Sequence, residues 1–366
     1  MGRSAAPSAV RQQAAPGEFI GLLDGFREKL DRELASWLAA KRQAAAGSRE
    51  MLELIDGVGE LVTQGGKRLR PALVYYTYRA CGGPAEDEAL PVALATELLH
   101  TYLLIHDDIM DHAEVRRGQP SAHVRFRQSH LARGFHGDAQ DFGRSVAILL
   151  GDLAHTWAVE LFTGAERSGE LTRCFSVMSE EVIGGQYLEL LVAQRRAARE
   201  EDLLRVLRLK SGRYTAERPI QLGGLLARAS AAVLAGLSRY GTAVGEAFQL
   251  QDDLLGMFGD LGTVGKPVGE DLKEGKFTFL IFHALAAASP EERQLLESAL
   301  GRPDLPDESV ARIQRLLEET GARARVTEMV AERLREARQT LDGLDLRPDG
   351  KLFLAGLVDY LWERES

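Results

Sequence analysis

Two aspartate clusters are the residues of this chain whose types and spacing could do chemistry. Asp107, Asp108 and Asp111 lie in the segment ELLHTYLLIHDDIMD, so on a helix Asp107 and Asp111 would share one face, one turn apart. Asp252 and Asp253 end a second apolar segment, AFQLQDD, far downstream. A solvated acidic turn is the ordinary explanation, but the apolar flanks of both clusters do not suit it. If the two helices face each other, their carboxylates would form a cage for Mg²⁺.

Basic residues stand next to these acidic sites. The turn Gly65-Gly66 opens into a helix with Lys67, Arg68 and Arg70 at its start, where backbone N–H groups, the helix dipole and the side chains all attract an anion. A basic turn on the surface is the alternative. Further cations follow an aspartate cluster or end another helix: Arg116, Arg117, Lys210, Lys266 and Lys276. Metal-binding carboxylates that alternate with phosphate-binding cations are what a diphosphate site requires.

Composition excludes several classes of protein. The 366 residues include 45 Lys and Arg against 54 Asp and Glu, and a formal net charge of −9 disfavours binding to nucleic acid. A hydrophobic content of 45% excludes a disordered or collagen-like chain. Cys81 and Cys174 are too few for a disulfide framework and are interpreted as small buried residues of a reducing cytosol. The first residues lack the apolar region of a secretory signal, and the longest charge-free apolar stretch, 277–289, is too short to span a bilayer. We therefore expect a cytoplasmic protein with no integral membrane segment.

The elements that must position the candidate residues are helical almost throughout. The segment RPALVYYTYRACGG predicts a complete helix, with Pro71 in its first turn and Gly82-Gly83 as its end. A polar loop is expected at 129–143. Apolar helices are expected at 85–111, 144–163, 169–194, 199–210, 217–237 and 239–258. Residues 1–17 have little to bury and are expected to be a mobile tail. Because alternating strand patterns and dividing linkers are missing, we expect one all-α domain, a helical bundle, at 18–366.

Seven segments in order carry a resemblance to a known family. They are GGKRLRP, ELLHTYLLIHDDIMD, RRGQP, GDLAHTWA, GGQYLEL, FQLQDDLLG and GKPVGEDLKEGK. With these segments, the chain resembles the trans-isoprenyl diphosphate synthases, or polyprenyl synthetases. The resemblance implies an all-α barrel around a central cavity, a homodimer, and a Mg²⁺-dependent prenyl transferase that joins isopentenyl diphosphate head to tail to an allylic diphosphate. The expected main product is C20 geranylgeranyl diphosphate, with C15 farnesyl diphosphate next.

The resemblance also implies a role for each matching residue. Asp107 and Asp111, supported by Asp108, would bind two Mg²⁺ ions of the allylic diphosphate, while Asp252 would bind a third ion with Asp253 in its outer shell. The residues that match those holding isopentenyl diphosphate are Lys67, Arg70, His100 and Arg117. The residues that match those neutralising the allylic diphosphate are Arg116, Lys210, Lys266 and Lys276, with Ser211 keeping the hydroxyl of a usual Thr. Gln186 and Gln249 match polar residues of the reacting centre.

Product length is expected to depend on Tyr102. This residue is fifth before Asp107, where an aromatic ring in the family forms a floor that limits growth to medium chains. Helix geometry alone would choose Leu103 as the lining residue, because Tyr102 lies about 140° away from Asp107 on an ideal helix. A core role for Tyr102 is the alternative.

Two departures from the family pattern leave other functions open. Glu189 stands where an Asp is usual, and Gly256 replaces the third aspartate of the second motif. The segment DDLLGMFGD also fits the loose metal motif of terpene cyclases, so a cyclase of the same fold is one alternative. A non-catalytic regulatory subunit is another. The retained GGKRLRP segment and His100 favour the transferase, because a cyclase needs no second diphosphate site.

Overall fold

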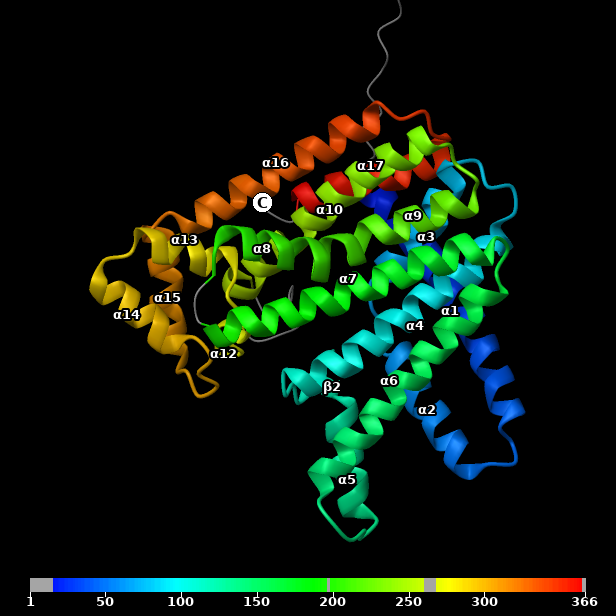
Figure 1. Cartoon of the computed structure of the whole chain (residues 1–366), viewed down its shortest axis with the longest axis horizontal. Coiled ribbons are helices and arrows are strands. Elements are labelled where there is room, and N and C mark those ends of the chain that lie inside the picture. The colour runs from blue at the N-terminus through cyan, green and yellow to red at the C-terminus, as the bar shows by residue number, and fades with distance from the viewer. Residues whose placement is uncertain (1–15, 196–197, 260–267, 364–366) are drawn as a thin grey trace, which may run out of the picture.

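The computed structural model describes residues 16–195, 198–259 and 268–363 (Figure 1). Its helices in the first half are α1 (Pro16–Ala44), α2 (Arg49–Thr63), α3 (Leu69–Ala80), α4 (Glu86–Met110), α5 (Ala122–Ala132), α6 (Ala139–Gly164) and α7 (Ser168–Arg195). The second half holds α8 (Glu200–Val206), the π-helix η1 (Leu207–Glu217), α9 (Arg218–Leu226), α10 (Ala231–Phe258), α12 (Glu270–Lys273), α13 (Phe279–Ala287), α14 (Pro290–Ala299), α15 (Asp307–Glu319), α16 (Ala322–Asp342) and α17 (Pro348–Glu363). A two-stranded antiparallel hairpin joins β1 (Val115–Arg116) to β2 (Gln119–Pro120). The predicted all-α class is confirmed.

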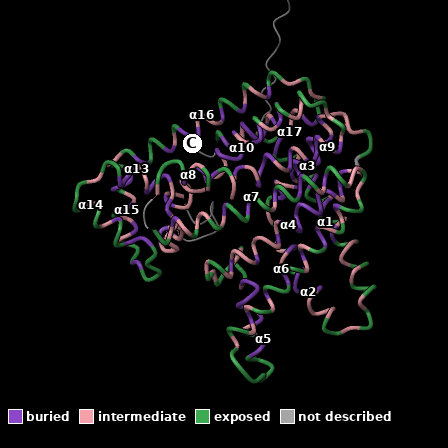
Figure 2. The backbone as a smooth tube through the Cα atoms, in the orientation of Figure 1, coloured by how far each residue is buried: buried purple, intermediate pink, exposed green. Residues whose placement is uncertain are grey.

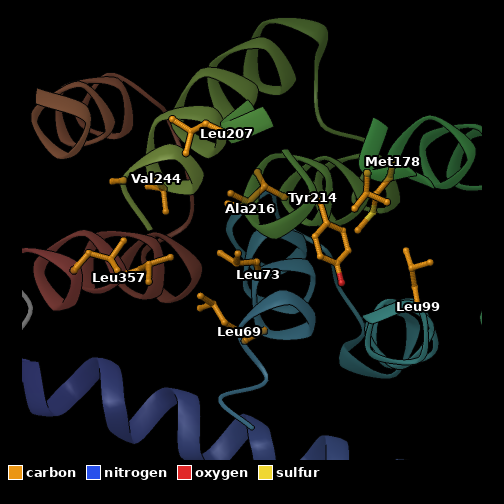
Figure 3. Packing of buried hydrophobic residues seen from close by; sticks show 14 of the residues in the cluster. Leu69, Leu73, Leu99, Met178, Leu207, Tyr214, Ala216, Val244 and Leu357 are labelled. Carbon is orange, nitrogen blue, oxygen red and sulfur yellow. The ribbon is translucent and has the colours of Figure 1, made fainter. Parts of the chain in front are cut away.

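The two helices that end in aspartates lie inside the bundle. α4 packs against α3 and α6, and α10 packs against η1, α9 and α16 (Figure 1). Figure 2 shows buried residues concentrated along these inner helices, whereas α14 is largely exposed at the periphery. Leu73 of α3, Leu99 of α4, Met178 of α7 and Val244 of α10 belong to one apolar cluster (Figure 3). This shared core fixes how the two aspartate helices sit relative to each other.

Several element boundaries differ from the sequence-based expectation. A helix at 217–237 is wrong, because the chain breaks after Leu226, where Arg228 takes a left-handed φ of 59°, and α10 then runs unbroken from Ala231. The Ser230 hydroxyl starts α10 by accepting a hydrogen bond from the Val233 N–H at 3.3 Å. The helix expected at 199–210 is α-helical only to Val206 and continues as η1. The loop expected at 129–143 is shorter, because α5 reaches Ala132 and α6 begins at Ala139.

Glycines of α10 let η1 approach it closely. A Cβ at Gly245 would lie 2.1 Å from the Gly212 carbonyl oxygen, and one at Gly241 would lie 2.7 Å from the Glu217 Cα. Real side chains do not tolerate such contacts, so these two positions require glycine. The result is that η1, with Lys210 and Ser211, is held against the helix that carries Asp252.

The remaining expectations concern the chain start, the thiols and apolar spans. α1 begins at Pro16, so the predicted tail reaches two residues too far, and residues 1–15 lie outside the described part of the chain. Cys174 is buried as expected, Cys81 is only half-buried, and both are free thiols. Two described helices, Asp87–Met110 and Ala139–Gly164, are long and apolar enough to cross a membrane by length and composition. The first of them is mostly buried inside the protein.

Candidate active site

A cavity of about 500 Å³ brings the two aspartate clusters together. The predicted site residues that line it are Lys67, Asp107, Arg116, Lys210, Ser211, Gln249, Asp252, Asp253 and Lys276. Apolar side chains line another part of the wall, among them Leu104, Val192, Leu203, Leu207, Phe248 and Phe279. The cavity can therefore hold a molecule with a strongly anionic end and an apolar chain.

The first aspartate cluster ends α4, and each of its carboxylates has a cation as partner. The Asp108 carboxylate is buried and accepts hydrogen bonds from the Arg116 guanidinium, with Nε at 2.8 Å. Asp107 Oδ1 lies 3.6 Å from Lys210 Nζ, and Asp111 Oδ2 lies 3.3 Å from Lys276 Nζ. Asp108 thus holds the cavity residue Arg116, while Asp107 and Asp111 face cations that come from distant parts of the chain.

The second aspartate cluster lies near the end of α10. Burial raises the pKa of Asp253 well above its usual value, and the negative charges of Asp271 and Asp252 raise it further. Gln249 Nε2 donates a hydrogen bond to Asp253 Oδ1 at 2.8 Å, which counteracts part of this shift. The carboxylates are therefore crowded to a degree that favours an added cation.

Gly256, the departure in the second motif, lies directly under a carboxylate from another element. A Cβ at Gly256 would be 2.9 Å from Asp271 Oδ2, and Asp271 lines the same cavity. The Gly269 N–H donates to the Gly256 carbonyl at 2.9 Å and so ties the start of α12 to α10. Sequence reasoning did not single out Asp271, although GEDLKEGK contains it.

The lysines of the cavity are charged because carboxylates surround them. Burial lowers the pKa of Lys276, but Asp271, Asp111 and Glu274 raise it by more, so the pKa lies well above its usual value. The pKa of Lys210 is also raised, since Glu189 and Asp107 outweigh the effect of burial. Glu189, the second departure, accepts a hydrogen bond from Lys210 Nζ. Its longer side chain still reaches the lysine of η1.

A second cationic group surrounds Arg70 at the start of α3. Arg70 Nη2 donates to the Thr215 hydroxyl at 2.8 Å, and Nη1 lies 3.3 Å from His100 Nε2. Burial, and then the charge of Arg70, holds the pKa of His100 well below 6.5, so its ring is neutral near pH 7. Because Arg70 can only donate, Nε2 must accept and Nδ1 must donate to the Tyr214 hydroxyl at 2.7 Å. His100 and Tyr214 therefore orient Arg70.

Tyr214 and Thr215 were missed by sequence reasoning. Both lie in η1, four residues after Lys210 and Ser211, and this spacing is the signal that could have indicated them. The Thr215 hydroxyl reaches Arg70, and the Tyr214 hydroxyl reaches His100, because η1 packs against α3.

The glycine turn before α3 carries the other two cations of this group. Lys67 lines the cavity, and its Nζ lies 5.8 Å from the centre of the Tyr360 ring. Arg117 donates a hydrogen bond to the Gly65 carbonyl. The four residues expected at an isopentenyl diphosphate site thus meet around one turn.

Three predicted residues are placed differently or lie outside the described chain. The Tyr102 ring packs against His106 and His155, with ring centres 4.7 and 5.0 Å away, and Leu104 lines the cavity instead. Gln186 of α7 is not among the lining residues of the cavity. Its Nε2 is buried and has no hydrogen-bond partner in the described structure, and the same holds for the Nε of Arg70. Lys266 lies outside the described residues.

The donor set of the cavity fits Mg²⁺. Among the described residues, no three His, Cys, Asp or Glu side chains are close enough to hold a metal ion by themselves. Mg²⁺ commonly takes one or two carboxylates and completes its shell with water and substrate phosphate. Hard carboxylate oxygens from α4 and α10, facing one cavity beside cations, are ligands of that kind.

Comparisons with known proteins give a consistent result. The family model described as polyprenyl synthetase matches residues 53–319. The chain is 33% identical over 315 residues to a short chain isoprenyl diphosphate synthase of Methanothermobacter thermautotrophicus, covering 85% of this chain and 90% of that protein. It is 34% identical to a geranylfarnesyl diphosphate synthase of Aeropyrum pernix, covering 83% and 92%.

A solved structure is similar over nearly its whole length. It is a geranylgeranyl pyrophosphate synthase of Corynebacterium glutamicum complexed with isoprenyl diphosphate and magnesium, with a TM-score of 0.89 and 33% identity. The match covers 93% of this chain and 99% of that one.

Proposed function

The chain belongs to the polyprenyl synthetase family and is a prenyltransferase, and on this premise we propose that it condenses isopentenyl diphosphate head to tail with an allylic diphosphate. The observation that carries the proposal is the cavity that both Asp107 of α4 and Asp252 of α10 line, together with Lys210, Lys276 and Arg116. Apolar side chains line another part of the same cavity. Such a cavity suits an allylic diphosphate, whose head is anionic and whose tail is a hydrocarbon.

Asp107, Asp111 and Asp252 would hold Mg²⁺, and when bound the metal neutralises charge on the departing diphosphate. The number of ions proposed is three. Lys210, Lys276 and Arg116 bind the same diphosphate and stabilise it more as it leaves than while it is bound as an ester, which lowers the barrier to C–O cleavage. Leu104 and Phe248 exclude water from the allylic cation that results.

The second substrate is bound at the turn before α3. Arg70 and Lys67 bind the diphosphate of isopentenyl diphosphate, and the neutral His100 ring keeps Arg70 in place. Arg117 holds the turn through Gly65. The double bond is thereby positioned to attack the allylic cation, and the released diphosphate takes the proton that is lost. The chemistry requires no side-chain nucleophile.

Product length is proposed to be C20, with C15 next. The proposal rests on the family resemblance, in which an aromatic ring at the position of Tyr102 limits growth. Tyr102 itself lies one to two turns before Asp107 on α4, packs against His106 and the α6 residue His155, and is not a lining residue of the cavity. Similar proteins include a geranylgeranyl and a geranylfarnesyl synthase, whose named products differ by one C5 unit.

A homodimer is also proposed. Large apolar side chains stay exposed on neighbouring helices: Ile148 and Leu149 of α6, and Val177, Ile183, Tyr187 and Leu190 of α7. α6 passes the length and composition test for a membrane span, yet less than half of it is buried in the protomer. A second copy would cover this face in a dimer. Sedimentation of the purified protein tests the dimer. We also propose that the dimer is soluble and cytoplasmic.

Labelled isopentenyl diphosphate, incubated with Mg²⁺ and a short allylic diphosphate primer, tests the reaction. An elongated diphosphate is the expected product. A cyclic hydrocarbon made from the allylic substrate alone would indicate the terpene cyclase. No product, while an added active partner is stimulated, would indicate the regulatory subunit.

A further inference from the structure

The turn before α3 is held in a conformation that most side chains avoid. Gly65 and Gly66 have φ of 85° and 127°, and Arg68 has φ 51° and ψ 31°, which is the left-handed region. Glycine adopts this region freely, whereas an arginine Cβ crowds the backbone there. Arg68 is therefore a strained residue in a turn whose other left-handed positions are glycines.

The Arg68 side chain is buried and bound to three other helices or their ends. Only 3% of the residue is exposed. Its Nη1 donates to Glu97 Oε1 of α4 at 2.5 Å, and Nη2 donates to the Val62 carbonyl of α2 at 2.6 Å. Nη2 and Nε also donate to Asp31 Oδ1 of α1, at 3.1 and 3.3 Å. These bonds can hold the backbone of Arg68 in a conformation that it would otherwise leave.

The residues on either side of Arg68 belong to the proposed isopentenyl diphosphate site. Lys67 lines the cavity, and Arg70 contacts His100 and Thr215. Glu97 and His100 are three residues apart on α4, so the same face of this helix binds Arg68 through one residue and Arg70 through the other. Arg68 itself is not a lining residue of the cavity.

We propose that Arg68 is a positioning residue for the second substrate. Its buried guanidinium maintains the left-handed backbone at position 68, and this backbone sets the directions of Lys67 and Arg70. Arg117 holds the opposite end of the turn at Gly65. The inference rests on the proposed function, because it gives Lys67 and Arg70 their ligand.

Two substitutions at one position separate this role from that of an ordinary ion pair. Arg68→Ala and Arg68→Gly both remove the guanidinium, but only glycine accepts the left-handed backbone without strain. We expect Arg68→Ala to raise the KM for isopentenyl diphosphate about tenfold, with kcat and the allylic KM within about twofold of wild type. Arg68→Gly is expected to raise the KM for isopentenyl diphosphate by only about threefold. Equal effects of both variants, or an equal rise in the allylic KM, would overturn the proposal.

Matched variants keep the test decisive. Arg79→Ala removes an arginine of α3 that pairs with Asp349 on the surface, and wild-type KM values are expected. Should Arg68→Ala fail to fold, Glu97→Gln weakens the same anchor while Asp31 and Val62 still bind Arg68. An intermediate rise in the KM for isopentenyl diphosphate is then expected, and an unchanged KM would overturn the proposal.

Calorimetric binding of isopentenyl diphosphate to the folded proteins distinguishes the two possible failures. A wild type that makes no elongated product contradicts the proposed function. Equal affinity of the wild type and Arg68→Ala for isopentenyl diphosphate contradicts the role of Arg68, whether or not elongation occurs. Weaker binding by Arg68→Ala than by Arg68→Gly is the expected result.

Discussion

At the scale of single residues, the carboxylates of the cavity differ in what they contact. Asp108 is buried against Arg116, whereas Asp107 is partly exposed to the cavity beside Lys210. We expect Asp107→Ala to lower kcat by about 100-fold or more, because a metal ligand supplies several kcal/mol to the transition state. The free energy of unfolding should change by no more than about 1 kcal/mol, since the ion pairs of Asp107 are partly solvated.

Steady-state assays at saturating Mg²⁺ and urea denaturation check this prediction together. Asp342→Ala, an exposed aspartate at the end of α16, is the control and should keep wild-type kinetics. Near-normal turnover of Asp107→Ala would contradict the proposed metal role.

Arg70→Ala should act mainly on the second substrate. Its guanidinium lies at the turn before α3 and bonds to Thr215 and His100, not to the aspartates. Loss of charge-assisted hydrogen bonds to a diphosphate is expected to raise the KM for isopentenyl diphosphate by about tenfold or more. Thr215→Val, which removes only one contact of Arg70, should have a smaller effect in the same direction. The assignment fails if the allylic KM rises instead.

The neutral state of His100 has a consequence for stability. Burial and the nearby guanidinium charges hold its pKa well below 6.5 in the folded protein, so below that pH the unfolded chain binds a proton that the folded protein does not. The contribution to the free energy of unfolding is complete above pH 6.5 and declines as the pH falls toward the lowered pKa. Denaturation from about pH 7.5 to 5.5 should show a shallower slope for His100→Gln than for wild type. Parallel slopes would count against this cause.

Charged residues that interrupt apolar segments were predictable, and residues whose role depends on the packing of η1 and α12 were not. Asp107 and Asp252 stood out because acidic pairs interrupt apolar segments, which a sequence displays directly. Tyr214, Thr215 and Asp271 carry no such contrast. Their positions depend on how η1 and α12 pack, and that is a property of the folded chain.

At the scale of elements, helix existence was predictable but helix boundaries and type were not. Apolar spacing indicated α4, α7 and α10, yet the break at 227–230 depends on the left-handed Arg228 and the Ser230 cap, which no apolar pattern marks. Of η1, residues 207–210 and 217 were expected at the ends of two α-helices and residues 211–216 as the connection between them, since a π-helix has no separate sequence signature. The glycines at 241 and 245 would have suggested weak points of α10, but they serve its close contact with η1.

The tie between α10 and α12 predicts the effect of restoring the missing aspartate. Gly256→Asp would place a Cβ 2.9 Å from Asp271 Oδ2 and a second carboxylate beside it. Steric crowding and like charge should lower the melting temperature of the metal-free protein. Adding Asp271→Gly to Gly256→Asp should recover part of this loss, because it removes the crowded partner. Thermal melts without Mg²⁺ measure this, and a Gly256→Asp variant that melts at or above the wild-type temperature would contradict it.

At the scale of the whole molecule, product length depends on how helices close the end of the cavity. Tyr102 of α4 packs against His155 of α6, so its ring joins two helices one to two turns before Asp107, just outside the lining of the cavity. We expect Tyr102→Ala to lengthen the products by about one C5 unit or more, because removing a large ring leaves space that the surroundings do not fully refill. Leu104→Ala, which widens the cavity wall, is the comparison. Chromatography of dephosphorylated products checks both, and identical lengths for wild type and Tyr102→Ala would place the floor elsewhere.

The ion pairs across the cavity also determine how an anionic substrate can approach an acidic protein. Lys210 and Lys276 already have Asp107 and Asp111 as counterions, so these two lysines offer an allylic diphosphate little uncompensated positive charge. With a formal net charge of −9, the molecule as a whole repels a free diphosphate. A diphosphate that arrives already complexed with divalent cations carries almost no net charge and meets no such barrier. Binding then becomes an exchange of counterions, in which lysines pass from carboxylate to phosphate, and capture should depend little on long-range attraction and little on ionic strength.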